Sequence, residues 1–265
     1  MQTPRMPVLF VGHGSPMNTL EDNRFTRAWR SLGRTLPRPQ AILAISAHWY
    51  VPELAVTAME IPPTIHDFGG FPQALFDFQY PAPGDPALAA RVQHLLQPLN
   101  VAADQDWGLD HGTWSVLAHL FPAANIPVVQ LSMDRSKPAA FQYEIGKQLA
   151  GLRDEGVLIL GSGNVVHNLA AIRWGDPDVP YDWASRFERR VKDMLLRRDS
   201  AALIDHSHLD PEARLSVPTA EHYLPLLPIL GAVQDDDEIS FPVEGIHLGS
   251  LSMLSVLAGN SRPNA

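Results

Sequence analysis

Histidines are the residues of this sequence whose type and placement could do chemistry. The chain of 265 residues contains eleven of them, and an imidazole can bind a metal ion or move a proton near neutral pH. Three stand where a short apolar run gives way to a loop: His13 in FVGHGSP, His48 in AILAISAHW and His167 in VLILGSGNVVH. Two more open segments of helical period, namely His111 in DWGLDHGTW and His222 in HYLPLLPIL.

The three histidines at strand ends predict a metal site. Continuous apolar runs such as AILAISA are typical of parallel strands that are covered on both faces. The carboxyl ends of such strands converge on one edge of the sheet, where ligands bind. One histidine at a strand end is more often a hydrogen-bonded structural residue, but three at the same edge favour metal binding. Imidazole suits zinc, iron, copper and nickel alike, so the residue type does not choose among these metals.

Competing chemistries lack their sequence signatures. The glycines of GHGS and GSGN complete neither G-x-G-x-x-G nor G-x-x-x-x-G-K-[ST], the common phosphate-binding patterns. Neither G-x-S-x-G nor H-E-x-x-H occurs, which argues against a serine-hydrolase elbow and a common metalloprotease motif. The absence of cysteine excludes disulfides, thiolate zinc sites, iron–sulfur clusters and cysteine nucleophiles.

Short β-rich runs alternate with longer segments of helical period, which is the pattern of an α/β domain. No linker, repeat or low-complexity tract divides the chain, so we expect a single domain over residues 1–265 with a central, largely parallel sheet flanked by helices. Strands are predicted at 7–11, 41–47, 54–58, 127–131, 157–160 and 246–257. Helices are predicted at 25–32, 86–96, 113–120, 138–153, 183–198 and 222–230. Residues 199–218 are expected to form a loose, mobile excursion.

Charge and composition argue against two classes of partner. The net charge is −9, from 29 acidic and 20 basic side chains, whereas a nucleic-acid binder needs a clustered cationic face. The basic residues at 186–198 are interleaved with acidic ones, which indicates a solvated helix face. The apolar stretch Val8–Val11 is too short for a signal core or a membrane span. We therefore expect a cytoplasmic protein that binds neither nucleic acid nor membranes; its oligomeric state is left open.

Seven motifs together resemble one known family. They are GHGSP at 12–16, SAHW at 46–49, TIHDFGGFP at 64–72, DHGTW at 110–114, GSGNVVHNL at 161–169, PTAEHYLP at 218–225 and EGIHLGSLSM at 244–253. These closely resemble the 4,5-DOPA extradiol dioxygenase family, which belongs to the class III, LigB-like ring-opening dioxygenases. The resemblance extends from about residue 7 to residue 257, with only 176–216 lacking a recognisable motif.

The resemblance implies a non-haem metal held by histidines. Transferred residue by residue, it makes His13 and His48 two of the ligands and His222 the third. His167 matches a histidine that such enzymes use as an acid or base near the metal, and that can serve as a fourth ligand in zinc-bound members. His111 matches a histidine that contacts the substrate or supports the ligands. Distant class III relatives have a glutamate as the third ligand, so Glu221 stays an alternative to His222, which is favoured.

The implied activity is extradiol cleavage of a DOPA-like catechol by O2 to a muconic-semialdehyde type of product. The expected cofactor is non-haem Fe(II), with Zn(II) as an alternative bound metal. The catechol would bind through both hydroxyl oxygens, with His167, or else His111, transferring the proton. Two other readings stay open, a zinc-dependent hydrolase or lyase and a non-enzymatic metal-binding protein on the same fold. Aromatic residues in or beside the motifs are expected to be ordinary packing: Trp49, Tyr50, Phe68, Phe71 and Trp114.

Overall fold

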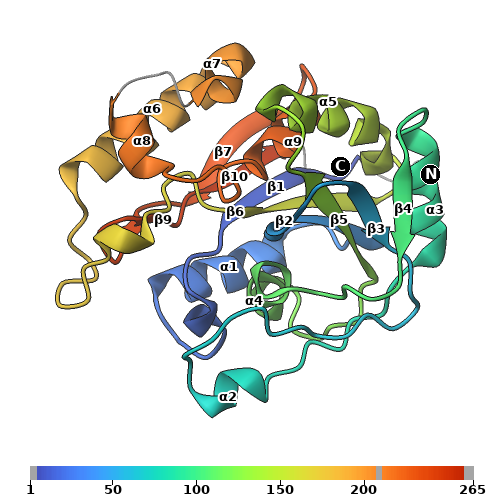
Figure 1. Ribbon diagram of the computed structural model, residues 1–265, viewed down its shortest axis with the longest axis horizontal. Coiled ribbons are helices and arrows are strands. Elements are labelled where there is room, and N and C mark those ends of the chain that lie inside the picture. Colours follow the sequence, from blue (N-terminus) through green and yellow to red (C-terminus); the bar gives the residue numbers. More distant parts are fainter. Residues whose placement is uncertain (1–4, 207–210, 260–265) are drawn as a thin grey trace.

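The computed structural model of the chain describes residues 5–206 and 211–259. Within that part, eight strands form one sheet in the order β4-β3-β5-β2-β6-β1-β10-β7 (Figure 1). Four central strands run parallel: β1 (Val8–Gly12), β2 (Ala41–Val51), β5 (Val128–Asp134) and β6 (Val157–Gly163). Antiparallel pairing joins the flanking strands to this core: β3 (Leu54–Thr57) pairs with β5, and β10 (Ser255–Gly259) pairs with β1. The outermost strands are β4 (Val101–Asp104) and β7 (Glu238–Val243).

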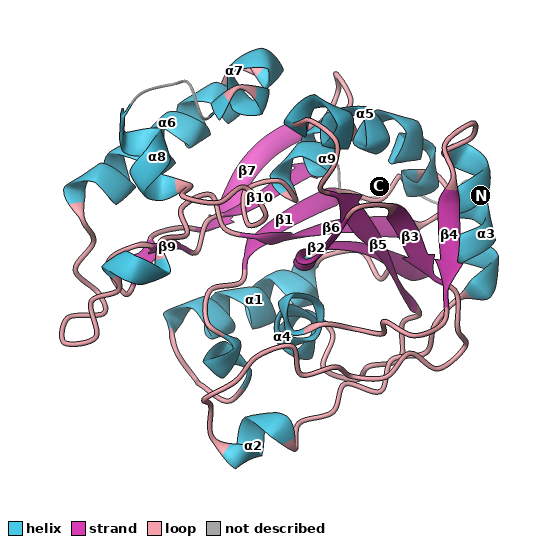
Figure 2. Cartoon of the chain, in the orientation of Figure 1, coloured by secondary structure: helices cyan, strands magenta, loops and turns pink. Residues whose placement is uncertain are grey.

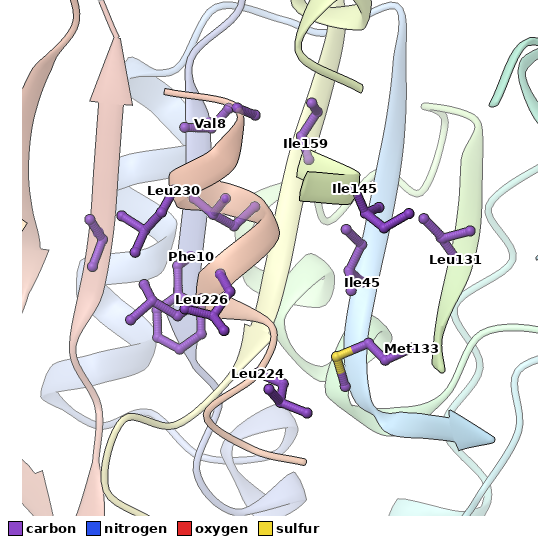
Figure 3. Packing of buried hydrophobic residues seen from close by; sticks show 14 of the residues in the cluster. Val8, Phe10, Ile45, Leu131, Met133, Ile145, Ile159, Leu224, Leu226 and Leu230 are labelled. Carbon is purple, nitrogen blue, oxygen red and sulfur yellow. The ribbon is translucent and has the colours of Figure 1, made fainter. Parts of the chain in front are cut away.

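Helices cover both faces of the sheet, which explains why its central strands are apolar throughout. One face packs against α1 (Arg24–Thr35) and α4 (His111–Leu120), the other against α5 (Ala139–Leu149) and α9 (Leu226–Gly231) (Figure 2). Along β1, Val8 and Phe10 enter one core, and Leu9 and Val11 enter the other. Figure 3 shows the first core, where Leu226 and Leu230 of α9 meet Val8 and Phe10.

The remaining described elements lie around this sandwich. They are η1 (Pro16–Thr19), α2 (Gln73–Phe76), α3 (Pro86–Leu95), η2 (Ala150–Arg153), η3 (Leu169–Ala171), α6 (Asp182–Leu196), α7 (Ser200–Ile204), α8 (Pro211–Ser216) and a small ribbon of β8 (Ile246–His247) and β9 (Leu251–Ser252). No helix of the described residues has both the length and the apolar character needed to cross a membrane.

The structure corrects several predicted elements. The strand predicted over 246–257 is three separate pieces, β8, β9 and β10. The described part of the segment 199–218, which was expected to be loose, contains α7 and α8, and residues 207–210 of that segment lie outside the described residues. The helix predicted from His222 begins only at Leu226, because Pro225 lacks the N–H that a continuing helix needs. Two edge strands were missed: β4 is only four residues long, and β7 is largely exposed and contains Pro242, which weakens the strand signal.

Candidate metal centre

The histidines gather at the carboxyl edge of the parallel strands. His13 is the first residue beyond β1, and its backbone N–H donates to the Gly163 carbonyl at the end of β6 (3.0 Å). His48 lies within β2, whose pairing with β5 shifts register between Ile45 and Tyr50. Bulges of this kind re-aim side chains beside functional sites. The prediction that the strand would end before His48 is therefore wrong, and the irregular part of β2 carries this imidazole.

Ser162 fixes the position of the ring proton on His13. The Ser162 hydroxyl donates to the Gly112 carbonyl (2.5 Å), so it accepts from Nδ1 of His13 (2.9 Å). We therefore assign the proton of His13 to Nδ1, which leaves a lone pair on Nε2. That Nε2 lies 3.3 Å from Nε2 of His48. Two nitrogens that bind one ion at about 2.0–2.1 Å and near-tetrahedral angles are about 3.3–3.4 Å apart, so this pair has the spacing of two metal ligands.

His222 supplies a third imidazole from the turn before α9. Its carbonyl accepts from the backbone N–H of Asn164 (2.7 Å), and a Cβ on Gly163 would lie only 2.1 Å from that carbonyl oxygen. Nδ1 of His222 is 3.2 Å from Oε1 of Glu221, and donation to this carboxylate leaves Nε2 free to face the cluster. Together with the two imidazoles above, His222 offers one ring nitrogen, and the three nitrogens lie within 4.8 Å of one another.

His167 lies beside this trio rather than within it. Its backbone N–H donates to the Ser216 carbonyl (2.8 Å), and its ring stacks on His222 with the centroids 3.5 Å apart and the planes at 5°. Nitrogen lone pairs lie in the plane of an imidazole ring. Because the two planes are parallel, an ion in the plane of His222 lies out of the plane of His167. His167 instead forms a second donor group with Glu221 and His222.

His111 is the first residue of α4, and its ring centroid is 3.8 Å from that of His48. Asp110 caps this helix by accepting from the backbone N–H of Thr113 (3.1 Å). From the loop before α2, Asp67 accepts from the backbone N–H of His111 through Oδ1 (2.9 Å) and from Nδ1 of His111 through Oδ2 (2.9 Å). The same Oδ2 lies 3.4 Å from Nδ1 of His48. His48, Asp67 and His111 thus form a third donor group.

Burial keeps the imidazoles neutral. It lowers the pKa of both His13 and His222 well below the usual value of about 6.5, and the neighbouring imidazoles lower it further. Burial, and then the charge that His111 would carry, lowers the pKa of His48 to about 3. Burial also lowers the pKa of His167 to about 4. A neutral imidazole is the form that binds a metal, so at neutral pH these four rings present lone pairs rather than positive charges.

The pKa values of the two carboxyl groups beside His111 are shifted in opposite directions. Burial alone would raise the pKa of Asp67, but the hydrogen bond and charge of His111 outweigh it and lower that pKa. Burial, followed by the negative charge of Asp67, raises the pKa of Asp110 to about 6. Asp110 also accepts a hydrogen bond from the side chain of Gln130. A firmly ionised carboxylate therefore faces the imidazoles of His48 and His111, which favours a cation at this edge of the sheet.

Aromatic residues close one side of the cluster. Phe68 meets the His111 ring edge-on with the centroids 5.4 Å apart. Trp114 is fully buried and donates its indole N–H to the Ile65 carbonyl (2.9 Å), so it belongs to the packing beneath the site. Phe68, which the sequence analysis assigned to ordinary packing, thus contacts a histidine of the cluster.

The five histidines singled out from the sequence lie in one cluster. Sequence reasoning missed Ser162 and Asp67, whose hydrogen bonds fix the orientation of these rings. Asp67 lies in the motif TIHDFGGFP, but 44 positions separate it from His111, and no spacing rule connects the two. A carboxylate that supports a metal-binding histidine is a common arrangement, yet its identity depends on how the loops fold.

Comparisons with known proteins identify a family for this chain. The sequence model of one family, described as the catalytic LigB subunit of aromatic ring-opening dioxygenase, matches residues 6–250. A curated relative from Escherichia coli K12, named 4,5-DOPA dioxygenase extradiol, is 57% identical over 98% of this chain and 97% of its own length. A relative of the same name from Beta vulgaris is 37% identical over 86% of this chain and 87% of its own length.

A solved structure is also similar. The crystal structure of an uncharacterised protein from Escherichia coli K12 superposes with a TM-score of 0.85 at 51% sequence identity, and the match covers 96% of this chain and 100% of that one. The single α/β architecture with its mostly parallel sheet is therefore shared with a solved protein.

Proposed function

The chain belongs to the LigB family of aromatic ring-opening dioxygenases, and from this premise we propose that its histidine cluster binds the metal at which a DOPA-like catechol is cleaved. The observation that supports the proposal is the convergence of the neutral imidazoles of His13, His48 and His222 at the sheet edge where ligands of α/β proteins bind. One ring nitrogen of each lies within 4.8 Å of the other two. Relatives that carry the name 4,5-DOPA dioxygenase extradiol support the choice of substrate class.

The activity is extradiol ring opening. O2 reacts with the catechol, and the carbon–carbon bond next to the two hydroxyl-bearing carbons breaks. One carbon of that bond becomes a carboxylate and the other an aldehyde, so both atoms of O2 remain in the product. The reaction therefore needs a small aromatic substrate and O2, and enzymes of this family depend on a metal.

His13, His48 and His222 are the proposed ligands. Imidazole nitrogen suits Fe(II) and Zn(II) alike, and the 3.3 Å separation of the two Nε2 atoms fits a shared ion. We propose Fe(II) as the working metal and Zn(II) as a substitute that the same nitrogens would bind. When bound, the metal would acidify the catechol hydroxyls and provide a path for electrons from the ring to O2.

Glu221 is assigned to orienting His222 instead of replacing it as a ligand. Its Oε1 faces Nδ1 of His222 at 3.2 Å, an arrangement in which the carboxylate fixes the ring and leaves Nε2 available. Glu221 also accepts from the hydroxyl of Thr219 (2.7 Å), which holds the carboxylate beside the ring. The His13–His48–His222 group does not include Glu221, in agreement with the preference drawn from the motif AEHYLP.

His167 is the proposed proton-transfer group. Its ring is parallel to His222 and so is poorly placed to share an ion with it. Burial lowers the pKa of His167 to about 4, so the imidazole is neutral at neutral pH and able to accept a proton from a bound catechol. The imidazolium formed in this way could return the proton when the ring bond breaks.

The alternatives of a zinc hydrolase or lyase and of a non-enzymatic binding protein are not favoured. The family match and the curated relatives named above are ring-opening dioxygenases. The chain has no cysteine, and Ser162, which bonds His13, donates its hydroxyl proton to the Gly112 carbonyl and not to a base. All five histidines expected for the dioxygenase lie in the described cluster.

Oxygen uptake tests the proposed function. The protein is stripped of metal, reloaded without oxygen with Fe(II) or with Zn(II), and mixed with DOPA or simple catechols in aerated buffer. We expect the iron form to consume one O2 per yellow semialdehyde formed, and the zinc form and iron-treated His13→Ala to consume none. Absence of uptake with every catechol, despite one Fe(II) per chain, would contradict the proposal.

A further inference from the structure

We propose that Asp67 is a positioning residue of the ring-cleavage site: its carboxylate holds Nδ1 of both His48 and His111 and thereby aims Nε2 of each ring into the site. The inference rests on the proposed function, since it assigns His48 to the metal. It adds a residue from a loop that supplies none of the proposed ligands.

Both carboxylate oxygens of Asp67 face atoms of these two histidines. Oδ1 accepts from the backbone N–H of His111 (2.9 Å), and Oδ2 accepts from Nδ1 of the same residue (2.9 Å) while lying 3.4 Å from Nδ1 of His48. The residue is exposed through its backbone, but its side chain is only 17% exposed and points inward. One carboxylate thus bonds the imidazole at the start of α4 and lies beside the imidazole of β2.

This bridge determines which ring nitrogens carry protons. The hydrogen bond to Oδ2 places the proton of His111 on Nδ1, and the negative charge of the same oxygen, 3.4 Å from Nδ1 of His48, favours a proton on that nitrogen as well. Nε2 of each ring then presents a lone pair. Ser162 has the same effect on His13. The two Nε2 lone pairs of His13 and His48 therefore face each other across 3.3 Å, an arrangement that a cation between them stabilises.

The surroundings of Asp67 make this position rigid. The positive end of α4 faces the carboxylate, since His111 is the first residue of that helix. Two hydrogen bonds tie the loop to the same region: Ile65 N–H donates to the Leu109 carbonyl (2.9 Å), and the Trp114 indole donates to the Ile65 carbonyl (2.9 Å). Phe68, the next residue, packs edge-on against the His111 ring. Asp67 thus bonds His111 at Nδ1, and Phe68 packs against the ring of the same residue.

Asp67→Asn separates this role from simple packing, because the amide has nearly the same shape. Its NH2 group would face an imidazole Nδ1 and favour the opposite tautomer, with the proton on Nε2 of His111. A wrong histidine tautomer of this kind lowers kcat by about 10⁴ in serine proteases, and loss of a carboxylate behind a metal-bound histidine weakens metal binding by about 10–100-fold. Asp67→Glu keeps the charge and should recover part of both losses.

The test makes three measurements on wild type, Asp67→Asn, Asp67→Glu and the control Asp77→Asn. Asp77 directly follows α2, and its exposed carboxylate accepts a hydrogen bond from the side chain of Gln73. Nitrogen-15 NMR of the histidines of the zinc-loaded protein gives the tautomers. Competition with a chelating dye gives the zinc dissociation constant, and oxygen uptake by the iron form gives kcat and KM separately.

The expected result for Asp67→Asn is a His111 proton moved to Nε2, zinc binding weakened by about 10-fold or more and a kcat lowered by at least about 10²-fold with KM changed little. Asp67→Glu should lie between wild type and Asp67→Asn, and Asp77→Asn should match wild type. Unchanged tautomers with unchanged zinc affinity in Asp67→Asn would overturn the proposal. If wild type cleaves no catechol, the proposed function fails, but the tautomer and zinc measurements still decide the role of Asp67.

Discussion

At the scale of single residues, burial makes the histidine cluster fit to bind a cation. Burial of His13, His48, His167 and His222 lowers the pKa of each below its ordinary value, so these rings stay neutral where exposed histidines would begin to protonate. Ser162 bonds Nδ1 of His13, and Asp67 bonds Nδ1 of His111 and lies 3.4 Å from Nδ1 of His48. The Nε2 lone pairs of His13 and His48 are thereby left for the proposed ion. Neutral charge and fixed tautomers together are what a metal ion requires of imidazole ligands.

Metal binding should therefore depend little on mild acidification. A lowered pKa means that a proton binds His167 only near pH 4 and His48 only near pH 3, so protons do not compete with the metal for these imidazoles between pH 7.5 and 5.5. We expect the cobalt dissociation constant, followed by the visible absorbance of bound Co(II), to change by less than about 3-fold over this range. Three ligands with an ordinary pKa of about 6.5 would lose about 10³-fold, and a loss of that size would contradict this account.

The lowered pKa values of these histidines also make the stability of the metal-free protein depend on pH. Unfolded histidines take up protons below pH ~6.5 while the buried ones do not, so the unfolded state binds more protons and stability falls as the pH decreases from that point. The loss continues down to about pH 4 for His167 and about pH 3 for His48.

The residue types in the cluster could be predicted from the sequence, but their supports could not. His13, His48 and His167 stand out because each follows a buried apolar run. Asp67 does not, because a carboxylate in a loop is ordinarily solvated and only the fold brings it 2.9 Å from His111. Ser162 is equally inconspicuous within GSGN.

At the scale of elements, the close approach of neighbouring segments positions the proposed ligands His222 and His48. Gly163 ends β6 directly against the carbonyl of His222, and Asn164 bonds that carbonyl through its backbone N–H. The bulge in β2 has the corresponding role for His48. The site thus depends on backbone positions in β2 and β6 as much as on its side chains.

Gly163→Ala tests this dependence. The added methyl would lie 2.1 Å from the His222 carbonyl oxygen, so the turn that carries His222 must move away from β6. We expect unfolding free energy to fall by about 1–3 kcal/mol and zinc affinity, measured by dye competition, to fall by at least about 10-fold. Gly175→Ala is the matched control, since no atom lies within 4 Å of its added methyl. Wild-type zinc affinity in Gly163→Ala would show that His222 is not held in this way.

The sequence predicted the central strands well because they are covered on both faces and therefore continuously apolar. It predicted the rest less well. The edge strands β4 and β7 lack that signal because water reaches them. The start of α9 was misplaced because the apolar spacing of HYLPLLPIL continues through a turn that Pro225 separates from the helix.

At the scale of the whole molecule, a buried ion pair that stabilises the fold and the histidine cluster lie at opposite edges of the sheet. At the amino edge, the fully buried Arg153 donates to the carbonyls of Met6 and Ala232 and to both oxygens of Asp237. Burial alone would raise the pKa of Asp237, but the bonds from Arg153 outweigh it and lower that pKa. The carboxyl edge, by contrast, holds a cluster of imidazoles, and burial keeps those of His13, His48 and His222 neutral, the arrangement expected of a binding site rather than of a structural clamp.

The most direct test of the central claim is anomalous diffraction from crystals grown or soaked without oxygen in Fe(II). The account predicts one iron about 2.1 Å from Nε2 of His13, His48 and His222, with His167 and Glu221 beyond bonding distance and room left for a catechol. An iron bound between His48, Asp67 and His111, or one held by His167 and Glu221, would contradict it.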